Sequence, residues 1–320
     1  MNKEMTKQKS SKDMGKWLSK LGPLVALVVL VILVTIMNPS FLSSVNLLNL
    51  LRQVSVNALI AFGMTFVILT GGIDLSVGST LALSGAFVAG LISSGMSPLL
   101  AMIAGLMVGA ILGMINGLLI AKGNMAPFIA TLATMTIYRG LTLVYTNGNP
   151  ITGIGDSFLF QFIGRGYLFG IPFPIIIMLV SFALLFVLLH KTAFGKKTYA
   201  IGGNIKAAKL AGVNTDRVQM WIYTLSGLMA SLSGIILTSR LNSAQPTAGQ
   251  AFEMDAIAAV VLGGTSLSGG KGRIFGTLVG ALIIGTINNG LNLLGVSSFY
   301  QQIIKGIVII IAVLLDRKKK

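Results

Sequence analysis

Asp74 is the only acidic residue between two long apolar stretches of the chain. An ionisable side chain at membrane depth is costly, so it is often functional, as a site for a proton, an ion or a polar solute. Aspartate is also common at the start of a helix, where its carboxylate accepts from free amide groups, and Ser76 follows closely. Two interpretations of Asp74 therefore stand: a group on a transport path, and a cap at the inner water interface.

Side-chain amides recur in or near the apolar stretches. An amide both donates and accepts, which suits a neutral polyhydroxylated solute better than an ion. Hydrogen bonding between helices is the simpler role for each amide taken singly. The candidates for a translocation path are Asp74, Ser76, Asn57, Asn116, Asn288 and Asn289.

No credible arrangement of nucleophile, base and acid occurs in the chain. It has no cysteine and one histidine, His190, which follows an apolar run and is interpreted as an interface residue. Leu267–Lys271, LSGGK, looks like the signature loop of an ATP-binding cassette, but the sequence has no G-x-x-x-x-G-K-[ST] phosphate loop. We therefore expect no catalytic residue, cofactor or metal, and no ATP hydrolysis by this chain itself.

The longest polar segment, His190–Arg217, carries six basic residues. Asn204 is placed to N-cap a short helix, IKAAKLA, Gly212 to end it in the left-handed region, and Asn214 to cap the next helix. Gly202-Gly203 predicts a sharp turn before the first cap. A seven-residue helix is unstable alone in water. We therefore expect it to pack against the membrane domain or another protein.

Glycines recur every four residues inside two apolar stretches. Such a stripe has no side chains, so another helix can approach it closely. Packing within one subunit is favoured, and a subunit interface is the alternative. The glycines are Gly105, Gly109, Gly113 and Gly117, then Gly276 and Gly280.

Membrane helices must position these groups, because 54% of the 320 residues are hydrophobic and only 10% are charged. Soluble domains are about a quarter charged, and about 20 apolar residues span a bilayer. The expected fold class is an all-α polytopic membrane protein of about ten transmembrane helices. The expected spans are about 21–37, 54–70, 76–92, 99–121, 127–145, 175–189, 218–238, 255–263, 274–294 and 299–315. A short interfacial helix over 46–52 and a loop over 146–174 complete this prediction, with broken helices or re-entrant turns near 71–76 and 263–273.

The basic residues predict the orientation. Nineteen lie in segments assigned to the inside and three, Arg52, Arg165 and Arg240, in segments assigned to the outside. By the positive-inside rule both termini are cytoplasmic. This makes 1–20 and 317–320 basic tails, 21–316 the membrane domain, and the first apolar run an uncleaved helix rather than a signal peptide. The alternative is eight or nine spans, with 69–79 or 252–272 re-entrant.

The net charge of +16 follows this topology, with attraction to anionic membrane lipid second. Nucleic acid is not an expected partner, because no soluble domain presents a recognition element. Gly71–Gly78, GGIDLSVG, also resembles Gly263–Gly270, GGTSLSGG. Paired interrupted helices mark transport paths in some transporters, and chance similarity of two glycine-rich turns is the alternative.

Several segments resemble sugar permeases of the ABC importer class. The segment Tyr199–Asn204 with Ala207-Ala208 and Gly212 resembles their inner coupling loop, and Leu69–Gly78 and Ala256–Arg273 resemble two further signatures. Ser243–Gly249 and Ile287–Gln301 narrow the resemblance to permeases for ribose, and it covers nearly the whole chain from Leu21. The family usually has an acidic residue just after Gly203-Asn204, where this chain has Ile205-Lys206.

The resemblance implies the membrane subunit of an ATP-driven importer of ribose or a similar monosaccharide, in the bacterial plasma membrane. It implies a second copy of the chain, an ABC ATPase on the cytoplasmic side and an extracytoplasmic sugar-binding protein. The ATPase-coupling residues would be Tyr199, Gly203, Asn204, Lys206, Ala207, Ala208, Lys209 and Gly212. Arg52, Arg165 and Arg240 are candidates for docking the binding protein, and solvated surface arginines are the alternative.

Two other classes stay open from the residues alone. An ion-coupled secondary sugar transporter would use Asp74, Glu253 or Asp255 as its coupling site. A membrane scaffold protein would carry no solute at all.

Overall fold

The structure, a computed structural model of the 320-residue chain, describes residues 22–154 and 157–317. Within this part, six helices are long and apolar enough to cross a membrane, and three shorter apolar helices accompany them. The predicted class of helical polytopic membrane protein is therefore confirmed. The predicted tail over 1–20 lies outside the described residues, as do positions 318–320 of the second tail.

The helices of sufficient length are α2 (Ser44–Leu69), α4 (Pro98–Ala121), α5 (Pro127–Thr146), α7 (Phe173–Lys191), α10 (Thr215–Leu241) and α12 (Ile274–Leu293). The shorter apolar helices are Gly22–Met37, α3 (Val77–Ser93) and the Ser298–Ile311 part of α13 (Ser298–Arg317). The remaining elements are η1 (Pro39–Leu42), α6 (Phe158–Arg165), β1 (Tyr167–Leu168), β2 (Ile171–Pro172), α8 (Ala193–Gly203), α9 (Ile205–Leu210) and α11 (Phe252–Leu262).

Local signals set the helix starts. The side chain of Ser43 accepts from Asn46 N at the start of α2, and the side chain of Ser97 accepts from Leu100 N at the start of α4. Such caps satisfy amide groups that have no partner inside the helix. Proline in the first turns of α4, α5 and α7 removes a donor that would have been free.

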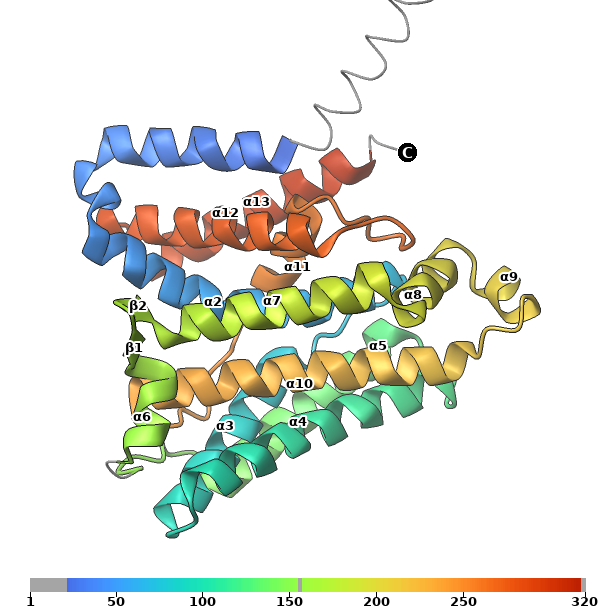
Figure 1. Cartoon of the computed structure of the whole chain (residues 1–320), viewed down its shortest axis with the longest axis horizontal. Coiled ribbons are helices and arrows are strands. Elements are labelled where there is room, and N and C mark those ends of the chain that lie inside the picture. The colour runs from blue at the N-terminus through green and yellow to red at the C-terminus, as the bar shows by residue number, and fades with distance from the viewer. Residues whose placement is uncertain (1–21, 155–156, 318–320) are drawn as a thin grey trace, which may run out of the picture.

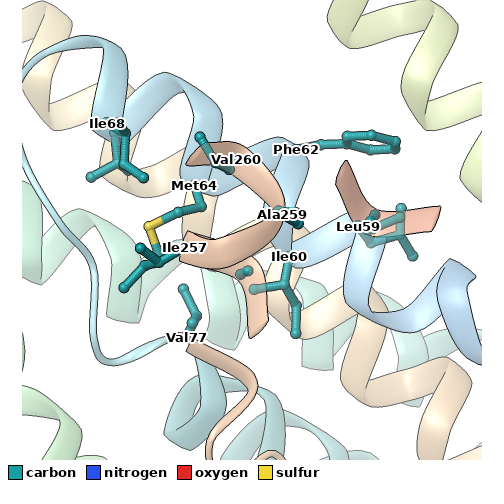
Figure 2. Packing of buried hydrophobic residues seen from close by; sticks show 14 of the residues in the cluster. Leu59, Ile60, Phe62, Met64, Ile68, Val77, Ile257, Ala259 and Val260 are labelled. Atoms are coloured by element: carbon teal, nitrogen blue, oxygen red, sulfur yellow. The ribbon is translucent and has the colours of Figure 1, made fainter. Parts of the chain in front are cut away.

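The core lies where α2 meets its neighbours. Most of α2 is buried, and it packs against α7, α10, α11 and α12. Figure 2 shows Met64 of α2 next to Ile257 and Val260 of α11, and Ile60 of α2 near Ala259. The outer helices instead expose apolar side chains, as expected for contact with lipid.

Helix α10 and the helices that pack on it form a second layer beside α2. It contacts α4, α3 and α2 along its length, and Figure 1 shows α4 running beside α10. The two short helices α8 and α9 lie at one end of the molecule, and α6 with the β1–β2 hairpin lies at the other end (Figure 1). The long helices therefore run between two ends of the molecule, one formed by α8 and α9 and the other by α6 and the hairpin.

Three local predictions were wrong. No separate helix covers 46–52, because α2 runs unbroken from its Ser43 cap. The segment 146–174 contains α6 and the small hairpin, whose Tyr167 pairs with Pro172. The pair Gly202-Gly203 is the last turn of α8 rather than a sharp turn, since the chain bends only at Asn204.

Helix α11 is unusually short for its place in the chain. Its 11 residues extend about 16 Å at 1.5 Å per residue, roughly half of a bilayer core of about 30 Å. Non-helical chain precedes and follows it, at 242–251 and 263–273. A similar break at 70–76 separates α2 from α3.

Candidate coupling face and polar interior

The short helix α9 is built by the predicted caps. Asn204 Oδ1 accepts from Ala207 N at 3.0 Å, and Asn214 Oδ1 accepts from Arg217 N at 3.0 Å. Gly212 has φ +81°, in the left-handed region where glycine carries no penalty. The residues that begin and end α9 therefore all lie within a few positions of it in the sequence.

The outer surface of α9 combines cations with an apolar side chain. Ala208 is buried, whereas Leu210 is 91% exposed and Ile205 is 43% exposed. Lys206 and Lys209 are exposed beside them. They also line a cavity of about 330 Å³ between α9 and the turn from α4 to α5. Single exposed apolar side chains are common on protein surfaces, so it is the combination of Leu210 with two lysines on one capped helix that makes α9 a candidate contact surface.

The last turn of α8 contacts the end of α2 and the glycine-rich break that follows α11. A Cβ added to Gly202 would collide with Leu69 O and with Gly270 N, and Gly270 N donates to Leu69 O at 2.9 Å. Tyr199 Oη donates to Gly272 O at 2.8 Å. Burial raises the pKa of the Tyr199 hydroxyl, so it keeps its proton for this bond near neutral pH. The last turns of α8 therefore touch the end of α2 and the turn that follows α11.

The two similar segments 71–78 and 263–270 meet in space. A Cβ added to Gly71 would lie 3.8 Å from Ser268 O, and one added to Gly269 would lie 3.0 Å from Leu69 O. The 263–270 turn also lies against Gly202 of α8, and each segment leads into a helix rich in small residues, α3 or α12. The two segments that are similar in sequence therefore also lie close together in space.

Asp74 lies inside the chain rather than at a water interface. It is 1% exposed. Its Oδ1 accepts from Ser76 N at 3.0 Å and from Ser76 Oγ at 2.7 Å, while Oδ2 accepts from Ser226 Oγ of α10 at 2.8 Å. Asn116 of α4 donates to Ser76 Oγ at 2.8 Å. The trio Asp74, Ser76 and Asn116 thus ties the α2–α3 break to α4 and α10.

The other predicted path amides divide into two groups. Asn289 and Asn46 exchange two amide hydrogen bonds of 2.9 Å between α12 and α2. Asn57 and Asn288 are half-buried, and the Oδ1 atom of each is buried without a hydrogen-bond partner among the described residues. Among the described residues, no recorded hydrogen bond links any of these four asparagines to Asp74.

The three predicted docking arginines come from α2, α6 and α10. Arg52 donates to Tyr167 Oη and lies 5.1 Å from the centre of that ring. Arg165 donates to Asn242 Oδ1 at 3.3 Å. Arg240 is in the last turn of α10. Its neighbour Ser239 accepts a hydrogen bond of 3.0 Å from Gly164 N of α6 through its Oγ. They therefore gather at the end of the molecule opposite α9 (Figure 1).

The glycine stripe of α4 faces helices of the same chain. Cβ atoms added to its glycines would collide with Val88 of α3, or with Ser231, Tyr223 and Met220 of α10. In the same way Gly276 and Gly280 face the backbone of α11 at Gly263 and Ala259. These close approaches explain why α10 packs so extensively on α4, and α12 on α11.

Two cations inside helices had not been assigned a role from the sequence. Lys305 of α13 forms an ion pair of 2.9 Å with Asp255 of α11. Arg139 of α5 donates to the carbonyl oxygens of Pro246 and Ala248, the latter at 2.9 Å. The signal was present, since cations inside apolar stretches require partners. No group of three or more metal-ligating side chains occurs among the described residues.

Comparison with known proteins gives consistent results. Residues 46–313 match the family model described as "Branched-chain amino acid transport system / permease component". The chain is 70% identical over 302 residues to the ribose import permease protein RbsC of Bacillus subtilis (strain 168), covering 94% of each protein. No solved structure matches it.

Two further relatives are more distant. The D-allose transport system permease protein AlsC of Escherichia coli (strain K12) is 45% identical over 278 residues, covering 87% of this chain and 85% of the relative. The probable ABC transporter permease protein YphD of the same organism is 40% identical over 299 residues, covering 93% and 90%. These similarities extend over nearly the whole membrane domain.

Proposed function

The chain belongs to the family of permease components of membrane transport systems, and we propose that it is the membrane-spanning subunit of an ATP-driven importer of ribose or a similar monosaccharide. The observation that carries the proposal is the 70% identity to a ribose import permease over 94% of both chains. The chain is a transport subunit and not an enzyme. The relatives lend no support to an ion-coupled transporter. Even YphD, which is only 40% identical, is named as a probable ABC transporter permease.

We place both termini and the α8–α9 region on the cytoplasmic side, in a bacterial plasma membrane. The helix Gly22–Met37 begins, and α13 ends, on the side of the molecule toward α8 and α9, which supports this orientation (Figure 1). The six long apolar helices, the three shorter ones and α11 make ten membrane elements. Segment 242–251 and the short α11 together make one crossing. Ten crossings then return the chain to its starting side, as the distribution of basic residues requires.

The ATPase partner would bind the α8–α9 region. The capped helix α9 presents Leu210 and two lysines to the cytoplasm, and α8 contacts the last residue of α2 and the break after α11. ATP binding and hydrolysis on the partner would move α8–α9, and the backbone contacts at Gly202 would pass that motion to both breaks. Interfaces of this kind respond in discrete steps because packed backbone cannot deform continuously.

Within this scheme a second copy of the chain completes the transporter, and the sugar passes between the two copies. We propose Asn57 and Asn288 as candidate groups on the path, because both side chains are only half-buried and so reach the surface of the chain. The geometry favours a bracing role for Asp74, Ser76 and Asn116, whose hydrogen bonds stay inside one chain. The Asn46–Asn289 amide pair likewise braces α2 against α12.

The outer end would receive a sugar-binding protein. Arg52, Arg165 and Arg240 gather there from three helices, and the Nε atoms of Arg52 and Arg165 are buried without a partner in the described part of the chain. Carboxylates of a partner protein would pair with the solvent-facing part of these half-buried guanidinium groups by charge-assisted hydrogen bonds. Membrane lipid covers the exposed apolar faces of the outer helices.

Co-purification tests the proposal. The subunit should copurify with an ABC ATPase, and Leu210→Asp should abolish this because a charge replaces an apolar contact at the interface centre. Phe169→Asp is the matched control, since Phe169 is 95% exposed at the tip of the outer hairpin and should leave ATPase binding intact. If no cassette ATPase copurifies with the wild-type subunit, the proposal is wrong.

A further inference from the structure

Arg139 places a cation deep in the membrane domain. It is the thirteenth residue of α5 (Pro127–Thr146), so it lies about 18 Å along that helix, near the middle of a bilayer core of about 30 Å. Its Nη1 donates to the carbonyl oxygens of Pro246 and Ala248. An intramembrane cation is costly unless it is paired. Arg139 thus fixes the segment that precedes α11 at this depth.

That segment, residues 245–251, is not helical, and its conformation is tightly determined. Gly249 has φ +71° and Ala251 has φ +66°, a left-handed conformation that carries strain for alanine. The backbone of Gly249 lies so close to Gly78 of α3 that a Cβ on Gly78 would collide with Gly249 O. The segment is therefore held from two sides, by α3 and by Arg139 of α5.

The third side of the segment is open. Thr247, Gln250, Ala251 and Met254 are exposed, and Glu253 is half-buried. Non-helical backbone at membrane depth is tolerated only where protein covers it or where it lines a water-filled space, because lipid cannot satisfy its polar groups. This face must therefore meet either water or another protein surface.

We propose that residues 245–254 line the solute path, with Thr247 and Gln250 as hydrogen-bonding contacts for a neutral polyhydroxylated solute and Arg139 as the positioning residue. A hydroxyl and an amide each donate and accept, which matches sugar hydroxyls. Met254 supplies an adaptable apolar surface beside them. The inference rests on the proposed function as a sugar importer and assigns groups that touch the sugar.

The natural absence of cysteine makes a direct test possible. Thr247→Cys and Gln250→Cys are prepared singly in the assembled, ATPase-bound importer in membrane vesicles, and ribose uptake of each is measured first. A negatively charged, membrane-impermeant thiosulfonate is then added, which reacts with the thiolate and so needs water around the sulfur. Ile137→Cys is the matched control, because Ile137 lies two residues from Arg139 on α5 and is 55% exposed among apolar neighbours.

We expect labelling at positions 247 and 250 to be at least about tenfold faster than at 137, with ribose slowing the labelling at both. Absence of labelling at both positions would overturn the proposal. The proposal would also be overturned if these positions form a disulfide between two copies of the chain but do not react with the thiosulfonate, since this would show that they lie in a dry interface. Rapid labelling that ribose leaves unchanged, in an importer that transports ribose, would overturn the sugar contacts.

The outcomes separate this inference from the proposed function. If the wild-type importer transports no monosaccharide although positions 247 and 250 are labelled, the water-filled path stands and the proposed substrate fails. For Arg139, the Lys variant keeps the charge but not the planar pair of donors. In Arg139→Lys importer that still binds the ATPase, the ratio of labelling rates at 247 and 250 should change, and an unchanged ratio would remove the positioning role.

Discussion

Adding one methyl group at Gly202 should loosen the contact between α8 and the two glycine-rich breaks. The new Cβ would collide with Leu69 O and Gly270 N, which are backbone atoms with no rotamer to move to. Overpacking of this kind costs about 1–3 kcal/mol. It also displaces the bond from Gly270 N to Leu69 O, 2.9 Å long, and such a bond contributes about 1 kcal/mol net.

Gly203→Ala is the matched control for folding stability. It lies in the same turn of α8, has no positive φ, and has no heavy atom within 4 Å of an added Cβ. Both substitutions gain the same helix propensity, up to about 1 kcal/mol, so this gain cancels between them. The free energy of unfolding of Gly202→Ala should therefore be lower than that of Gly203→Ala by about 2–4 kcal/mol.

The assay is thermal unfolding of each purified subunit in the same detergent, followed by uptake measurements in assembled importer. Gly202→Ala should melt several degrees lower than Gly203→Ala, and it should transport less sugar per ATP hydrolysed while still binding the ATPase through α9. Equal melting temperatures for the two variants would refute the close backbone contact on which the coupling argument depends.

Three further predictions concern single contacts. Asn204→Ala should destabilise α9 by about 1 kcal/mol through loss of its cap and lower ATPase co-purification, whereas Asn204→Ser should retain both; equal binding by the two variants would contradict this. Lys206→Glu combined with Lys209→Glu should weaken ATPase binding more at low salt than at high salt without changing membrane insertion, and a normal yield of complex would count against a direct electrostatic contact. Ser226→Ala should lower the free energy of unfolding by about 1.5–3 kcal/mol, since it removes a donor to the buried Asp74 carboxylate; an unchanged melting temperature would show that this bond is absent.

Local capping chemistry could be predicted from the sequence. Asn204, Gly212 and Asn214 act within four residues of their own positions, so neighbouring residue types determine their roles. The ends of the long helices followed in the same way from proline, serine and glycine. The α4 glycine stripe was also recognisable from its spacing, because a four-residue period places side chains on one face of a helix.

Contacts between distant segments could not be predicted. Asp74 bonds to Ser226, 152 residues later, and nothing near Asp74 in sequence indicates that partner. Gly202 was predicted to form a sharp turn, whereas the structure requires glycine there for close approach to Leu69 O. The two cases have one cause, since a residue type that suits a turn or a cap also suits a tight tertiary contact.

The charges inside helices show a similar limit. Arg139 was visible as a cation in an apolar stretch, but its partners are two carbonyl oxygens, which every residue carries. The pairing of Asp255 with Lys305 likewise depends on how α11 packs on α13. Sequence alone thus indicates which charged side chains need partners, and the tertiary structure determines which groups are those partners.

Ribose uptake under controlled energy supply tests the central claim, that a partner ATPase drives transport through α8 and α9. Membrane vesicles containing the assembled importer are given constant ATP while the proton and sodium gradients are collapsed. Uptake should persist with the wild-type subunit and be lost on deletion of Ile205–Ala211, with the deletion variant still inserted in the membrane. Uptake that stops when the gradients collapse, or that survives the deletion, would contradict the claim.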